Sequence, residues 1–272
     1  MGRFDIRTRS GQISAIIQGQ AATSTDGDAQ AFFDRVTAAG GTLTQTEKDA
    51  VNTLTVSLKS AGVWTLIKAI YPMVGASAAA CAQNLKSSSF TGTFSSGWTF
   101  ASTGVTPNGT SAFMNTFLPP NGNLAQDDAH ASMYCRTNQI GVTSVDLGCG
   151  STGSNQDFYL SVFYGTAGVL ANINGSGGTG GATNITSLGF FLAQRVSSSS
   201  TFMYQNNTQV HSHTKVSTTP SSVNINLGRN TTSEYSSREM AFISFGSSFD
   251  ATQRGNLNSA VQTFQTSLNR NV

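Results

Sequence analysis

Carboxylates suited to acid–base chemistry are few beyond residue 85 of this 272-residue chain. Glycoside hydrolysis, for example, needs two carboxyl groups that flank the scissile bond. Glu234 and Glu239 are five positions apart, which would place them on opposite faces of a strand. The other acidic residues of this part are Asp127, Asp128, Asp146, Asp157 and Asp250. A nucleophile elbow of the form Gly-x-Ser-x-Gly is also absent from the sequence. We therefore expect no enzyme.

Histidine and aspartate spacing offers two weak candidates for metal binding. His211 and His213 would share one face of a strand, a spacing that a metal can use, with His130 as a distant third ligand. Asp127 and Asp128 follow a turn and could help to bind calcium. The simpler interpretations are a polar strand edge and an exposed turn. We predict no cofactor and keep calcium as an open alternative.

The three cysteines, Cys81, Cys135 and Cys149, are odd in number and lack metal-like spacing. Cys135 and Cys149 could face each other on neighbouring strands, so a disulfide is one possibility. Small buried thiols are the interpretation that we favour.

Tyrosines on loop rims could stack on sugar rings, with Asn, Gln and Asp side chains beside them to bind hydroxyl groups. The candidates for glycan binding are Tyr134, Tyr164, Tyr204 and Tyr235, and Tyr159 is a further aromatic of the same kind. The competing interpretation for each of them is a place in the hydrophobic core.

Composition indicates which elements must position these side chains. Ser, Thr, Gly, Asn and Gln supply 133 of the 272 residues, whereas charged residues supply 10% and the net charge is +2. Such a chain, with 17 Phe, suits short strands and many turns. Clustered Lys and Arg are missing, which argues against a nucleic-acid partner, and no apolar run reaches membrane-spanning length.

Residues 1–27 are polar and predict an extended arm. Five apolar side chains in this arm have no evident internal partner, and we expect them to anchor the protein to a particle: Phe4, Ile6, Ile13, Ile16 and Ile17. The basic start is not followed by the apolar core of a secretory signal. We therefore expect the product to remain in the cytosol in which it is made.

Residues 28–75 predict a helical docking module. Phe32, Phe33 and Val36 mark a first short helix. Thr44 and Glu47 form a capping box at the start of a second helix. The apolar stripe of this second helix contains Val51, Leu54 and Leu58. The spacing of Trp64, Ile67 and Ile70 predicts a third short helix.

Residues 76–272 predict an antiparallel two-sheet sandwich of about ten short strands with a closing C-terminal helix. Strands are expected at 143–147, 157–163, 223–227 and 241–245, and a hairpin at 202–211 turns at Asn206 and Asn207. The final helix is capped by Asp250 with Gln253, and its stripe contains Leu257, Val261, Phe264 and Leu268.

The segments 203–210, 223–228 and 240–250 together resemble the strands of concanavalin A-like and laminin G-like jelly rolls. The first resembles their hairpin with an Asn turn, the second their next strand ending in Leu-Gly, and the third their closing strand before a short helix. This resemblance implies a mainly β jelly-roll sandwich for residues 76–272 and implies no activity.

A second resemblance covers residues 28–110. It rests on the segments 32–36, 39–41, 44–47, 58–64 and 70–75, followed by 81–86 and 94–98. They resemble a helical module that precedes a jelly-roll domain in structural proteins of tailed bacteriophages. The resemblance implies a virion structural protein without stating its position on the particle.

Two functions are therefore expected from the sequence. The first is a non-enzymatic bacteriophage virion structural protein, assembled in the host cytoplasm and displayed on the particle surface as a head decoration, fibre or tail component. It would be a homo-oligomer bound to other virion proteins through its N-terminal region, with no nucleic acid and no membrane as partner. The alternative is a carbohydrate-binding adhesin or receptor-binding tail-fibre module that binds a host-surface glycan.

Overall fold

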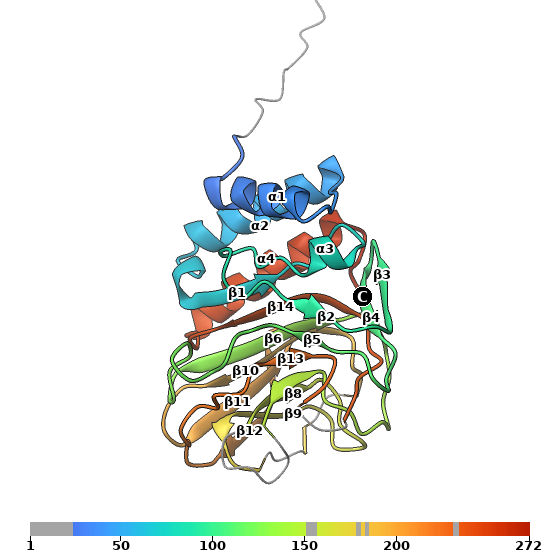
Figure 1. Cartoon of the computed structure of the whole chain (residues 1–272). Coiled ribbons are helices and arrows are strands. Elements are labelled where there is room, and N and C mark those ends of the chain that lie inside the picture. Colours follow the sequence, from blue (N-terminus) through green and yellow to red (C-terminus); the bar gives the residue numbers. More distant parts are fainter. Residues whose placement is uncertain (1–23, 151–156, 178–180, 183–184, 231–233) are drawn as a thin grey trace, which may run out of the picture.

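The computed structural model describes residues 24–150, 157–177, 181–182, 185–230 and 234–272. These residues form three layers, namely a group of helices, a large sheet beneath it and a smaller sheet below (Figure 1). The proposed anchors Phe4, Ile6, Ile13, Ile16 and Ile17 lie outside the described residues. None of the described helices is long and apolar enough to cross a bilayer.

The large sheet is antiparallel and lies in the middle layer, with the strand order β12-β11-β10-β6-β14-β4-β3 and with β1 also paired to β14. Its strands are β1 (Ile67–Tyr71), β3 (Trp98–Ala101), β4 (Gly104–Pro107), β6 (Ala129–Cys135), β10 (Gly189–Arg195), β11 (Ser200–Gln205), β12 (Thr208–Thr214) and β14 (Met240–Gly246).

The smaller sheet is also antiparallel and has the order β2-β5-β13-β7-β8-β9. Its strands are β2 (Thr93–Phe94), β5 (Met114–Asn115), β13 (Asn226–Leu227), β7 (Leu147–Cys149), β8 (Asp157–Ser161) and β9 (Leu170–Gly175). The two sheets confirm the predicted mainly β, two-sheet sandwich.

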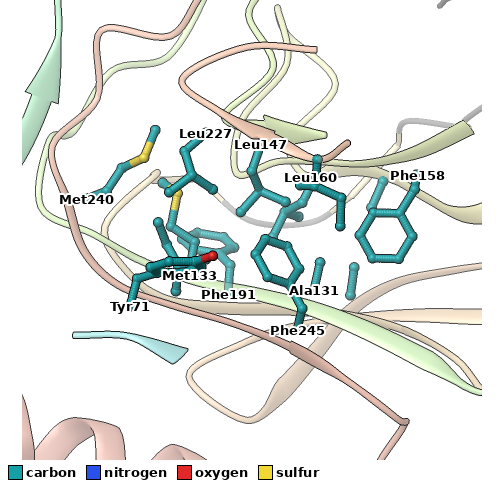
Figure 2. Packing of buried hydrophobic residues seen from close by; sticks show 14 of the residues in the cluster. Tyr71, Ala131, Met133, Leu147, Phe158, Leu160, Phe191, Leu227, Met240 and Phe245 are labelled. Carbon is teal, nitrogen blue, oxygen red and sulfur yellow. The ribbon is translucent and has the colours of Figure 1, made fainter. Parts of the chain in front are cut away.

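The core between the sheets follows from strand alternation. Ala131 and Met133 of β6 point toward the smaller sheet and meet side chains such as Leu147 and Leu160, as Figure 2 shows. The intervening residue Ser132 and its neighbour Tyr134 face the opposite side, and they too are fully buried. The central strands are therefore buried on both faces, which requires a layer above the large sheet.

Helices supply that layer. They are α1 (Gly27–Ala38), α2 (Gln45–Ser60), the short α3 (Ala78–Cys81) and α4 (Ala251–Ser267). A second apolar core joins their buried stripes to the upper face of the large sheet, where Phe242 of β14 packs between Phe190 and Phe264. Both predicted capping boxes are present, at Thr44 with Glu47 and at Asp250 with Gln253.

The prediction of a third helix around Ile67 and Ile70 is wrong. Residues Trp64–Leu66 form one 3-10 turn, after which β1 pairs with β14 and places Tyr71 opposite Ile243. A short apolar run fits a buried strand as well as a helix, and the isoleucines favour the strand. The strand forms in place of the helix because β14 offers its backbone hydrogen-bonding groups to this segment.

The predicted strands are confirmed in the large sheet, whereas those of the smaller sheet are shortened or displaced. Asn206 and Asn207 both have positive φ and turn the β11–β12 hairpin as expected. The strand predicted at 143–147 is displaced to β7, which shares only Leu147 with it, and the strand predicted at 223–227 is reduced to the two-residue β13. Val223 is outside β13 and 47% exposed, because the pairing with β5 and β7 begins only at Asn226.

Candidate functional site

Two of the four candidate tyrosines face the helical layer. Tyr134 is fully buried, and its hydroxyl donates to Oδ1 of Asn271 at 2.5 Å. Tyr204 is 8% exposed, with the guanidinium of Arg254 from α4 lying 4.0 Å from its ring centre. Tyr159 of β8 is buried as well. The rings of Tyr134 and Tyr204 have no open face, because helix packing and the Arg254 guanidinium cover them.

The other two tyrosines lie on loops, Tyr164 in contact with Glu234 and Tyr235 next to Glu234 in the chain. The Tyr164 hydroxyl donates to Oε1 of Glu234 at 2.5 Å, and Nδ2 of Asn230 donates to Oε2 at 2.7 Å. Partial burial and the Glu234 carboxylate raise the pKa of Tyr164 to about 12. The carboxylate is thus held in place by donors from two separate loops.

Tyr235 belongs to an adjoining stack built around Arg229. Nη1 of Arg229 donates to the Tyr235 hydroxyl at 3.0 Å, while the guanidinium carbon lies 3.5 Å from the ring centre of Phe113. The stack depends on the tight turn at Gly228, whose φ is positive and where a Cβ would lie 2.9 Å from the carbonyl oxygen of Ala112.

Neighbouring loops extend this surface with aliphatic side chains. Val142 accepts from the backbone N–H of Gly165, next to Tyr164, and is 38% exposed. Ile140 and Ile185 are 54% and 87% exposed. We call this surface the loop cluster, and it comprises residues 138–143, 163–168, 185–187, 229–230 and 234–237.

The loop cluster combines the groups that recognise hydroxylated ligands. Half-buried rings offer apolar faces, a fixed carboxylate and an amide offer hydrogen bonds, and a guanidinium adds a further donor. A groove of about 200 Å³ between α2 and α4 is lined by hydroxyl-bearing and apolar side chains, and Asp49 is the one charged residue among them. Its polar lining consists of Thr and Ser hydroxyls and that carboxylate, without the amide and the guanidinium that the loop cluster offers.

The two glutamates considered for catalysis have structural partners. Glu234 accepts from Tyr164 and Asn230, whereas Glu239 forms an ion pair with Arg136 at 2.9 Å. A histidine and a serine do meet, where Nε2 of His130 lies 3.0 Å from Oγ of Ser244. That pair is fully buried under the helical layer and is out of reach of a substrate.

His211 and His213 share β12 as predicted, whereas the third predicted ligand, His130, lies on β6, separated from β12 by two strands. His130 is bound to Ser247 and Ser244 within the fold, while His213 of β12 faces the carbonyl oxygen of Ala171. Asp128 accepts from the backbone N–H of Ser248. Within the described ranges, no three His, Cys, Asp or Glu side chains gather in a way that could hold a metal ion.

The cysteines are confirmed as free, buried thiols. Burial raises the pKa of Cys81 and Cys149 to about 12, and it raises the pKa of Cys135 as well. The alternative disulfide between Cys135 and Cys149 does not form. Thiols with such pKa values are unreactive near neutral pH.

Sequence reasoning did not identify the partners of the two loop tyrosines. Arg229, Asn230 and Phe113 were not candidates, and Glu234 was considered only as a catalytic acid. One signal was available, since Arg229, Asn230, Glu234 and Tyr235 lie within seven residues after a Leu-Gly strand end. The contact with Tyr164 comes from a distant loop and leaves no local pattern.

Comparison with known proteins adds evidence on the fold. The chain matches no protein-family model and no curated protein. Among solved structures, it is similar to domain 4 of AbnA, a GH43 extracellular arabinanase from Geobacillus stearothermophilus, in complex with arabinotriose. That match has a TM-score of 0.53 and 15% identity, and it covers 70% of this chain and 97% of that one.

A second similar structure is a mutant of Trypanosoma rangeli sialidase displaying trans-sialidase activity. Its TM-score is 0.52 at 11% identity, over 81% of this chain and 38% of the sialidase chain. The chain is a jelly-roll-like β-sandwich. At these identities the likeness extends to the fold alone, and the loop cluster must be interpreted from its own side chains.

Proposed function

We propose that this protein is a non-enzymatic carbohydrate-binding module that recognises a glycan through the loop cluster. The observation that carries the proposal is the Glu234 carboxylate, held between Tyr164 and Asn230 beside the stack of Arg229 and Tyr235. A related fold in domain 4 of AbnA is in complex with arabinotriose, which supports a sugar as the ligand class. The fold likeness alone would not identify the site.

Binding without turnover is supported by the state of the acidic residues. Both oxygens of Glu234 accept hydrogen bonds, and Glu239 is paired with Arg136. A general acid and a second carboxylate would have to face each other across a sugar. On this surface the carboxylate instead fixes two neighbouring side chains and presents an ordered rim.

Carriage on a bacteriophage particle is the second part of the proposal. It rests on the resemblance of residues 28–110 to the helical module of tailed-phage structural proteins. The partners would then be other virion proteins and further copies of this chain, with a host-surface glycan as the target. Immunogold labelling of particles locates the protein, and particles that lack the label would contradict this part.

Substitutions in the loop cluster test the sugar site. An array of oligosaccharides that includes arabinotriose, probed with the labelled full chain, identifies a bound glycan. Tyr164→Phe and Glu234→Gln should each weaken that binding about tenfold or more, because each breaks a hydrogen bond to a charged group. Isothermal titration with the glycan gives the dissociation constants.

Tyr204→Phe provides the matched control, because this tyrosine faces the helical layer and its ring is covered by Arg254. The affinity of this variant should equal that of the original chain. If no array glycan binds, or if the control weakens binding as much as Tyr164→Phe does, the proposed site is wrong.

A further inference from the structure

A fully buried guanidinium lies beneath the loop cluster. Nη1 of Arg238 lies 3.1 Å from both carboxylate oxygens of Asp146 and 3.0 Å from Oγ of Ser144. Its Nη2 donates to the carbonyl oxygens of Phe163 and Gln139, and its Nε donates to Gln139 again. Every nitrogen of this guanidinium is thus bonded, and three of its partners belong to different segments.

Asp146 accepts hydrogen bonds from further segments of the chain. Its Oδ1 accepts from the Ser236 hydroxyl at 2.6 Å, and its Oδ2 accepts from the backbone N–H of Val162 at 2.8 Å. Its own carbonyl oxygen accepts from the backbone N–H of Gly228 at 2.7 Å. Asp146 and Arg238 have no exposed side-chain surface.

The segments that meet at this ion pair are those that carry the proposed binding groups. Phe163 precedes Tyr164, and Gly228 precedes Arg229. Ser236 lies two residues after Glu234, whose carbonyl oxygen accepts from the backbone N–H of Val145. Tyr164 and Glu234 therefore reach each other across loops whose backbones are fixed to one buried pair.

We propose that Asp146 and Arg238 form a positioning unit that holds Tyr164 against Glu234 and so preorganises the glycan site. This inference rests on the proposed function for its ligand, but the geometry it predicts is measurable without a ligand. A buried ion pair is often no more stabilising than well-packed apolar side chains, whereas it specifies orientation through its hydrogen bonds. Here those bonds end on the backbone and side chains of the binding loops.

Ser236→Ala gives a mild test in the full chain. It removes the hydroxyl that donates to Asp146 and accepts from the backbone N–H of Arg238, and it leaves the ion pair in place. Ser132→Ala is the matched control. It also removes a fully buried hydroxyl from a 2.6 Å hydrogen bond, with Ser244, on the surface of β6 that faces the helices.

Two measurements separate positioning from general stability. The first is a pH titration of ring-labelled tyrosine by NMR, with the Tyr164 signal assigned through Tyr164→Phe. Tyr164 of the original chain and of Ser132→Ala should ionise near pH 12, and that of Ser236→Ala should ionise closer to the ordinary tyrosine pKa of about 10. The second is glycan affinity on the array, which should fall about tenfold in Ser236→Ala alone.

Equal Tyr164 titrations in Ser236→Ala and Ser132→Ala would overturn the positioning role. If the original chain binds no array glycan, the proposed function fails while the titration still decides the positioning role. Arg238→Lys is a stronger variant that keeps the charge and loses the fork, and its Tyr164 pKa should fall at least as far. If Arg238→Lys does not fold, Ser236→Ala alone decides the outcome.

Discussion

Residue environment separates tyrosines that look alike in the sequence. Tyr134 and Tyr164 each follow a large apolar residue, yet one is enclosed by the C-terminal residues and the other meets a carboxylate on a loop. Environment also determines which ring nitrogen of the buried His130 carries the proton. His130 has a carbonyl acceptor at Nδ1, so this nitrogen carries the proton and Nε2 accepts from the Ser244 hydroxyl.

Stability should fall in mild acid because of His130. Burial lowers the pKa of His130 to about 4, whereas the unfolded chain takes up the proton near pH 6.5. Between these values the unfolded state binds more protons, so this contribution is complete above pH 6.5 and is lost as the pH falls toward 4. The free energy of unfolding should drop by up to about 3 kcal/mol across this window.

His130→Gln isolates that contribution, because an amide does not take up a proton in this range. Urea unfolding of both proteins between pH 7 and pH 4 gives the difference. The pKa of His213 is also lowered by burial, and it remains in both proteins. A variant whose stability depends on pH as steeply as that of the original chain would contradict the assignment to His130.

At the scale of elements, β14 is buried along its whole length and pairs with three strands. It pairs with β6, β4 and β1, and its two faces belong to two different cores. Ile243 and Phe245 pack between the sheets, while Phe242 meets Phe264 of α4. Such a position requires a near-continuous apolar run, which in β14 is interrupted by Ser244, a buried residue bonded to His130 and Ser132.

Removing the Phe264 side chain should therefore destabilise the fold strongly. Phe264→Ala leaves a cavity between α4 and β14, and we expect a loss of about 3–5 kcal/mol in the free energy of unfolding. Val56→Ala is a control on α2 whose side chain is 46% exposed, and it should change stability by less than about 0.5 kcal/mol. Urea titrations compare the two, and equal losses would mean that α4 does not pack as described.

At the scale of the whole molecule, the helices and the sandwich share one sheet. Tyr71 from the first third of the chain lies in the sandwich core, and Arg270 near the end donates to the carbonyl oxygens of Pro72 and Met73. Such contacts between distant parts of the sequence make folding slow and cooperative. They also imply that neither layer is stable without the other.

A truncation tests that dependence and the predicted boundary at residue 76. Residues 76–272 keep α4 but lack α1, α2 and β1, so the second apolar core would lose the side chains of those elements and β14 would lose its pairing with β1. We expect this fragment to aggregate or to bind a hydrophobic dye without cooperative unfolding. Residues 24–272 contain every described element and should unfold cooperatively. A cooperative transition in the shorter fragment would show that the sandwich is independent.

Local pattern determined much of this protein. The capping boxes at Thr44 and Asp250, the Asn206–Asn207 turn and the alternation of β14 act between neighbouring residues, so composition and spacing predict them. The two-sheet sandwich follows from the same signals. Scarce carboxylates likewise led to the expectation that no enzyme is present, which stays a prediction.

Only the tertiary structure decided where equivalent side chains would lie. Whether 67–71 becomes a helix or a strand depends on the free edge of β14, and whether a tyrosine is core or rim depends on which face α4 covers. The contact of Tyr164 with Glu234 and the bonds from Arg238 to three segments join residues far apart in the chain. Such contacts form only when folding brings those loops together, so no local spacing encodes them.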